Sequence, residues 1–190
     1  MNFLAHLVLS PDREEIMSGN FFADRVKGQK WRELPGLYAE GVLLHRRIDF
    51  FVDTHLEVRS AKSCLPDDFG LFRGVLLDVF WDHFLARDFF TLTGQDPIVF
   101  VEQAHRVLAN HANIFHPDAA RMVEAMKSGQ WLLGYADLDH LDRILNQMSD
   151  RFPHKNPMGQ GVKALQAAYL PLSKHFILLW KDLQKEFGET

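Results

Sequence analysis

The stretch LLDVFWDHFL, residues 76–85, decides the fold of this chain. Apolar residues occupy nearly every side of a helix drawn through it, which predicts a helix buried on all faces. Asp78 and Asp82 are four positions apart, so such a helix places both carboxylates on one apolar face. Two acids in these surroundings repel each other and lose hydration, so they need a strong partner. A divalent cation is one candidate, and Arg73 or Arg87 of the same helix is the other.

The stretch LHRRIDFFVD, residues 44–53, repeats this pattern. His45 and Asp49 lie one helical turn apart and share a face, so they can bind one metal ion or pair with each other. His6 stands in an apolar segment, and Asp24 follows two phenylalanines and an alanine. The alternative for a single histidine such as His6 is a core residue bonded to a backbone carbonyl. The coincidence of acids and histidines in four segments favours a metal site.

The ligand types indicate which metal to expect. Carboxylate oxygen and imidazole nitrogen together suit Mn²⁺, Mg²⁺ or Fe²⁺ better than a structural zinc. Cys64 is the single cysteine, so it offers neither a thiolate cluster nor a disulfide framework.

Helical periodicity dominates the whole chain, and we find no alternating strand pattern. We expect one all-α domain over residues 1–190, folded as a compact multi-helix bundle. Proline, glycine and capping residues predict the helix boundaries. The expected helices cover residues 2–9, 35–62, 66 to about 90, 137–151 and 162–187 (bent at Pro171), with further starts at Ser10-Pro11, Asp96-Pro97 and His116-Pro117, a break at residues 18–20, a stop at Gly129 and a loop at residues 153–159.

The composition excludes several classes of protein. Hydrophobic residues make up 47% of the 190 residues, which is typical of a folded globule and not of a disordered chain. The net charge of −4 argues against a general nucleic-acid binder. No segment approaches the roughly 18 consecutive apolar residues that a spanning helix needs. We therefore expect a soluble, cytosolic protein that binds neither nucleic acid nor membrane.

Four blocks of the chain resemble acyl carrier protein phosphodiesterase, a divergent relative of the HD-domain phosphohydrolases. They are MNFLAHL (residues 1–7), SGNFFAD (18–24), HRRID (45–49) and WDHFL (81–85). Further likeness continues at residues 130–132, Tyr135, Asp137, Asp139, residues 145–148 and Arg151. The blocks keep their order and spacing over most of the chain. The resemblance implies an HD-domain-like helical bundle and Mn²⁺-dependent removal of 4′-phosphopantetheine from the serine of an acyl carrier protein.

The resemblance also implies a set of site residues. Ordinary HD enzymes present a His, then a His-Asp pair, then an Asp, whereas the adjacent pair here is reversed and comes late in the chain. The expected metal ligands are His6, Asp24, Asp82 and His83, with His45 and Asp49 as further ligands or as partners that orient ligands. Asp78, which lies outside the matching blocks, joins these further candidates because of its spacing to Asp82. The other expected roles are a general base at Asp24 or Asp49, a phosphate clamp at Arg46 or Arg47, and a ligand-orienting or phosphate-orienting amide at Asn20.

A basic run follows Asp24 and is expected to bind the partner. Arg25, Lys27, Lys30 and Arg32 would attract a strongly acidic carrier protein, in spite of the negative net charge of the chain. The alternative is a solvated helix end.

Two other functions remain open from the sequence. An HD-type hydrolase acting on a nucleotide or small phosphomonoester would use the same metal chemistry. A non-enzymatic helical binding protein would pair its acids with arginines. The oligomeric state is not predicted. The histidines outside the matching blocks are expected at the surface, in caps or in the core: His105, His111, His116, His154 and His175.

Overall fold

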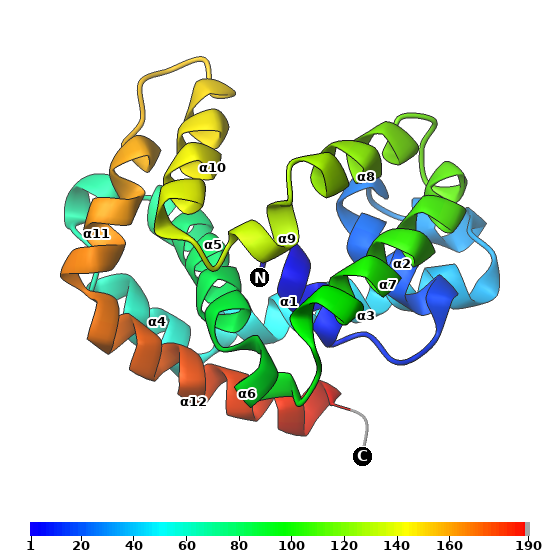
Figure 1. Cartoon of the computed structure of the whole chain (residues 1–190), viewed down its shortest axis with the longest axis horizontal. Coiled ribbons are helices and arrows are strands. Elements are labelled where there is room, and N and C mark those ends of the chain that lie inside the picture. The colour runs from blue at the N-terminus through cyan, green and yellow to red at the C-terminus, as the bar shows by residue number, and fades with distance from the viewer. Residues whose placement is uncertain (189–190) are drawn as a thin grey trace.

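The computed structural model describes residues 1–188, which contain helices and no strand, and this confirms the expected all-α fold (Figure 1). In chain order the elements are α1 (Phe3–Val8), α2 (Glu14–Phe22), η1 (Ala23–Arg25), η2 (Lys30–Glu33), α3 (Gly36–Thr54), α4 (Leu56–Ser63), η3 (Asp67–Phe69), α5 (Phe72–Arg87), α6 (Phe89–Thr93), α7 (Pro97–His111), η4 (Ala112–Ile114), α8 (Ala119–Ser128), α9 (Trp131–Gly134), α10 (Leu138–Asp150), η5 (Met158–Gln160), α11 (Gly161–Ala167) and α12 (Tyr169–Phe187).

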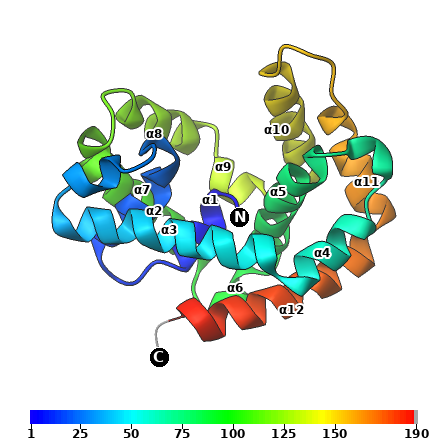
Figure 2. The same ribbon diagram turned by 180° about the vertical axis from the view of Figure 1, so that it is seen from behind.

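The helices form two groups with α1 and α9 between them. Figures 1 and 2 show α2, α3, α7 and α8 on one side and α4, α5, α10 and α11 on the other. Helix α5 is buried along most of its length, as its sequence predicts, and Trp81 stacks on Phe176 of α12 with ring centroids 5.8 Å apart. Asp82 and His83 are fully buried in it, whereas the side chain of Asp78 is 41% exposed.

Three expected helices are divided. The helix predicted from residue 66 to about 90 is interrupted between η3 and α5, at Gly70 and Leu71, and between α5 and α6, at Asp88. The helix predicted over residues 35–62 breaks at His55, whose backbone is extended and whose Nδ1 accepts a hydrogen bond from the Glu57 amide. The helix predicted over 162–187 breaks at Ala168 and not at Pro171. Pro171 lies in the first turn of α12, where a missing N–H costs nothing.

The predicted break at residues 18–20 is wrong, because α2 continues to Phe22. Gly19 serves instead to bring α2 against α3. A Cβ at Gly19 would lie 2.3 Å from the Tyr38 carbonyl oxygen and 2.9 Å from the Gly41 Cα, so the close approach requires glycine. This contact places Asn20 directly beside α3.

The helix ends follow the cap predictions in part. Asp96 accepts hydrogen bonds from the Ile98 and Val99 amides at the start of α7, and Gly129 ends α8, as expected. The starts predicted at Ser10-Pro11 and His116-Pro117 are displaced, because α2 begins at Glu14 and α8 at Ala119. None of the helices within residues 1–188 combines the length and the apolar character that crossing a membrane would require.

Candidate metal centre

Three side chains from two helices form a compact cluster. His6 comes from α1, and His45 and Asp49 come from α3. One potential ligand atom of each lies within 4.8 Å of the other two. The Asp49 carboxylate contacts the edges of both rings, with Oδ1 3.2 Å from His6 Nε2 and Oδ2 3.0 Å from His45 Nε2.

The tautomer of His6 follows from its contact with Asn20. The Asn20 side-chain amide donates to the His6 carbonyl oxygen at 2.8 Å and to Ser10 Oγ at 2.9 Å, so its oxygen must accept from His6 Nδ1 at 2.9 Å. The lone pair of His6 is therefore on Nε2. This nitrogen is buried and has no hydrogen-bond partner among residues 1–188, although Asp49 lies close.

His45 is held in the same way by the backbone of Asn20. Its Nδ1 donates to the Asn20 carbonyl oxygen at 2.7 Å, which leaves Nε2 to face Asp49. Histidines that bind metals are oriented by just such an Nδ1–H contact with a protein oxygen. Asn20 thus orients both imidazoles, one through its side chain and the other through its backbone.

Asp24 lies at the open edge of this cluster. Its Oδ1 is 3.4 Å from His45 Nε2, and its side chain is 81% exposed. His6, Asp24 and His45 line a small cavity of about 20 Å³, which suffices for one water-sized occupant. Asp49 lies beside both rings, so His6, Asp24, Asp49 and deprotonated His45 together form a donor set that fits a divalent cation.

Burial and charge shift the pKa values of the two imidazoles in opposite directions. Burial lowers the pKa of His6 to about 4 in spite of Asp49. Burial also lowers the pKa of His45, but hydrogen bonds to Asp24 and Asp49 outweigh it and raise the pKa to about 9. Burial raises the pKa of Asp49, but its hydrogen bond with His45 opposes burial, and the pKa is held well below its usual range.

Asp78 is linked to the cluster by the α-amino group of Met1, which contacts both Asp78 and Asp49. The α-amino group of Met1 lies 3.0 Å from Asp78 Oδ1 and 3.5 Å from Asp49 Oδ1. Burial lowers the pKa of this amine, but Asp78 and Asp49 raise it by more, so the pKa lies above its usual value. Asp78 therefore neighbours the cluster and contacts a cationic group.

The structure does not bring Asp82 and His83 into the cluster. Asp82 accepts hydrogen bonds from the Leu4 amide at 2.6 Å and from the Ala5 amide at 3.2 Å. His83 Nδ1 contacts the Tyr135 carbonyl oxygen at 2.8 Å, and its Nε2 contacts the Tyr169 hydroxyl at 2.7 Å. Both residues thus have other partners, although no arginine neutralises Asp82 within the described part of the chain.

The family to which the chain belongs follows from comparison with known proteins. The family model of acyl carrier protein phosphodiesterase matches residues 1–183. The chain belongs to the acyl carrier protein phosphodiesterase family. Proteins of that name from Salmonella paratyphi A and Enterobacter sp. strain 638 are each 34% identical over 177 residues, which cover 93% of this chain and 92% of each relative. No solved structure matches the chain.

The two arginines expected to clamp phosphate have protein partners in this structure. Arg46 donates to the carbonyl oxygens of Val26 and Gly28, at 3.0 Å and 2.8 Å. Arg47 points toward the end of α12, where it lies 3.8 Å from Glu186. Arg46 therefore holds the loop that follows Asp24, and Arg47 forms an exposed ion pair.

The basic run after Asp24 lies on the surface. Its four members are exposed: Arg25, Lys27, Lys30 and Arg32. Arg25 reaches Met122 Sδ of α8 at 2.9 Å, and Arg32 lies over the Trp31 ring. The run therefore begins next to the exposed carboxylate of the cluster.

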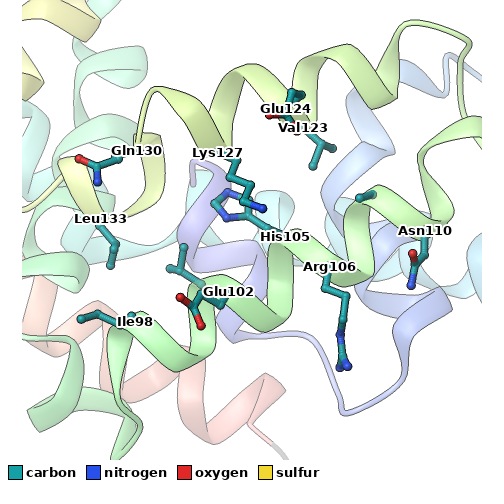
Figure 3. Close-up of a pocket in the computed structure, with 12 residues that line it drawn as sticks. Ile98, Glu102, His105, Arg106, Asn110, Val123, Glu124, Lys127, Gln130 and Leu133 are labelled. Atoms are coloured by element: carbon teal, nitrogen blue, oxygen red, sulfur yellow. The ribbon is translucent and has the colours of Figure 1, made fainter.

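A larger pocket of about 670 Å³ lies between α7 and α8 and contains none of the cluster residues (Figure 3). His105 lines it and is 7% exposed, and its Nε2 finds no hydrogen-bond partner in the described part of the chain. Two bases and two acids also line the pocket, so its charge does not select a ligand: Arg106, Lys127, Glu102 and Glu124.

Proposed function

We propose that this chain hydrolyses a phosphodiester with the help of a divalent cation bound by His6, His45 and Asp49. The observation that carries the proposal is the unpartnered Nε2 of His6. A buried polar atom without a partner costs free energy, and a cation between this nitrogen, His45 Nε2 and Asp49 removes that cost. Mn²⁺ is the expected metal, with Mg²⁺ or Fe²⁺ as alternatives.

The cation and Asp24 would have different roles in the reaction. The bound cation would lower the pKa of water and neutralise charge on the phosphate oxygens. The lowered pKa of Asp24, caused mainly by its hydrogen bond to His45, keeps this carboxylate ionised at neutral pH. Because Asp24 is exposed beside the centre, it is placed to accept the proton of the attacking water.

We further propose that the substrate is a holo-acyl carrier protein, as the names of the relatives imply. The bond cleaved joins 4′-phosphopantetheine to a serine of the carrier, and the products are the apo-carrier and free phosphopantetheine. The exposed basic run supports docking of an acidic protein. Arg46 contributes by fixing the Val26 and Gly28 carbonyl groups, so it shapes this surface and does not clamp phosphate.

The same proposal treats residues 1–190 as one domain that acts in the cytosol. The single domain is supported by a set of buried side chains that is continuous from Leu4 in α1 to Leu183 in α12. An HD-like arrangement of helices stays a prediction.

Mass spectrometry of the carrier protein tests the proposal. Purified enzyme is incubated with Mn²⁺ and holo-acyl carrier protein, in parallel with a chelator-treated sample. Loss of the phosphopantetheine mass only in the presence of metal is the expected result. Hydrolysis of nucleotides with an unchanged carrier would favour the HD-type alternative. An unchanged carrier and no bound metal would favour a binding protein.

A further inference from the structure

Helix α1 carries His6 but cannot hold itself in place. It spans six residues, and Asn2 at its N-cap makes no capping hydrogen bond through its side chain. An isolated helix of this length is unstable in water, and its first amides lack partners within the helix. The position of His6 therefore depends on contacts from other elements.

Asp82 of α5 supplies the missing cap. Its Oδ2 accepts from the Leu4 amide and its Oδ1 from the Ala5 amide, so both oxygens are used and the carboxylate is fully buried. These amides precede His6 by two residues and one residue. Burial raises the pKa of Asp82 to about 7, and the two amides oppose this shift because they favour the carboxylate. Both oxygens accept from the backbone of α1, so this contact fixes α1 close to its ligand.

His83 reaches α1 from a second direction, through Tyr135. Its Nδ1 donates to the Tyr135 carbonyl oxygen, and its Nε2 therefore accepts from the Tyr169 hydroxyl. The hydroxyl of the fully buried Tyr135 in turn accepts from the Asn2 side chain at 2.8 Å. His83 thus fixes the residue that holds the N-terminal end of α1.

From these contacts, and on the basis of the proposed function, we propose that Asp82 and His83 are positioning residues that set the place of His6 in the metal centre. Asp82 acts directly on α1, and Tyr135 transmits the effect of His83. Neither residue is a metal ligand. The adjacent acid and histidine in α5 hold one ligand of the centre, while Asn20 orients that ligand and its neighbour.

Titration of the metal-free enzyme with Mn²⁺ tests this inference in the Asp82→Asn and Tyr135→Phe variants. Asp82→Asn keeps one acceptor but turns an amide donor toward a backbone N–H, so Mn²⁺ affinity should fall about 10- to 100-fold. Tyr135→Phe loses only the contact with Asn2, so the fall should be roughly 2- to 10-fold. Asp96→Asn is the matched control, because Asp96 also accepts hydrogen bonds from two backbone amides, but these amides belong to α7 and not to α1. Its Mn²⁺ affinity should equal that of the wild type.

Pulsed electron paramagnetic resonance of the bound Mn²⁺ distinguishes positioning from ligation. The number of coordinated imidazole nitrogens should stay the same in Asp82→Asn, Tyr135→Phe and His83→Gln, and should fall by one in His6→Gln. Loss of a nitrogen in His83→Gln would overturn the inference, and so would wild-type Mn²⁺ affinity in both Asp82→Asn and Tyr135→Phe. If His6→Gln also binds Mn²⁺ like the wild type, the proposed function fails as well. Tyr135→Phe keeps the test valid if Asp82→Asn does not fold.

Discussion

The imidazole rings of His6 and His45 stack with their centroids 4.0 Å apart and their planes 15° apart. Because the rings are this close, a positive charge on one imidazole lowers the pKa of the other. Burial keeps the pKa of His6 at about 4, whereas the carboxylates beside His45 overcome burial and raise its pKa to about 9. At neutral pH the proton therefore resides on His45, and a cation that binds there must displace it.

The first prediction is a pH dependence of metal binding. Protonated His45 has no lone pair on Nε2, so binding of Mn²⁺ should release about one proton at neutral pH. Below pH 9 the apparent affinity should rise about tenfold for each pH unit. Calorimetric titrations at pH 6.5, 7.5 and 8.5, in buffers of different protonation enthalpy, measure both quantities. Equal affinities at the three pH values would show that His45 Nε2 does not bind the metal.

Asp49→Asn should abolish metal-dependent hydrolysis. The change removes the charge that contacts both imidazoles, so Mn²⁺ affinity should fall by more than about 100-fold. The activity should then approach that of the wild-type enzyme treated with a chelator. Asp53→Asn is a matched control, since it removes the same charge from an exposed position one turn further along α3. Metal analysis and turnover of both variants check the prediction, and an equal loss in both would contradict it.

Asn20→Ala should weaken the centre without removing a ligand. His6 then loses its orientation, because the side-chain oxygen that accepts from its Nδ1 is absent, whereas the residue-20 carbonyl oxygen that accepts from His45 remains. We expect Mn²⁺ affinity to fall about 10- to 100-fold. Ser10→Ala removes one contact of the Asn20 side chain and one hydrogen bond to the His6 carbonyl oxygen, but it leaves both imidazole contacts in place, so it should change the affinity by less than about threefold. A larger effect for Ser10→Ala than for Asn20→Ala would reverse the assigned roles.

The double variant Lys27→Glu and Lys30→Glu should raise KM for holo-acyl carrier protein more than it lowers kcat. The exposed charges act on docking and not on the chemical step, and salt should reduce the difference from the wild type. Reversal of the exposed Lys155 and Lys163 serves as the control for net charge. Steady-state kinetics at low and high ionic strength check the prediction. Equal KM values for the two double variants would argue against a docking surface in the basic run.

Gly41→Ala should destabilise the fold and the centre together. A Cβ at this position would lie 2.3 Å from the Ile16 carbonyl oxygen and 2.8 Å from the Asn20 amide nitrogen, so α2 must move away from α3. We expect a loss of about 1–3 kcal/mol in the free energy of unfolding and weaker Mn²⁺ binding. Gly36→Ala in the same helix meets no atom within 4 Å and is the control. Urea denaturation of both variants measures the difference.

The sequence predicts the composition of the centre better than its geometry. One-turn spacing places His45 and Asp49 together, and the structure brings His6 and Asp24 to the same pair. Periodicity also predicts that α5 is buried. It cannot say which partner Asp82 and His83 meet, because that depends on how α1 and Tyr135 pack against α5.

Local signals mislead where tertiary packing decides. The glycine at position 19 reads as a helix break, yet the structure uses it for close contact between two helices. His55 gives no sequence signal for a helix end, although its extended backbone divides α3 from α4. Tyr135 lies in a segment that resembles the family, but its contact with Asn2 joins residues 133 positions apart and is invisible in the sequence.

Anomalous diffraction from crystals of the Mn²⁺-loaded enzyme tests the central claim most directly. We expect a manganese peak within bonding distance of His6 Nε2, His45 Nε2 and an Asp49 oxygen. The Asp82 carboxylate should remain on the Leu4 and Ala5 amides. A manganese peak bonded to Asp82 or His83, or one away from all these residues, would contradict it.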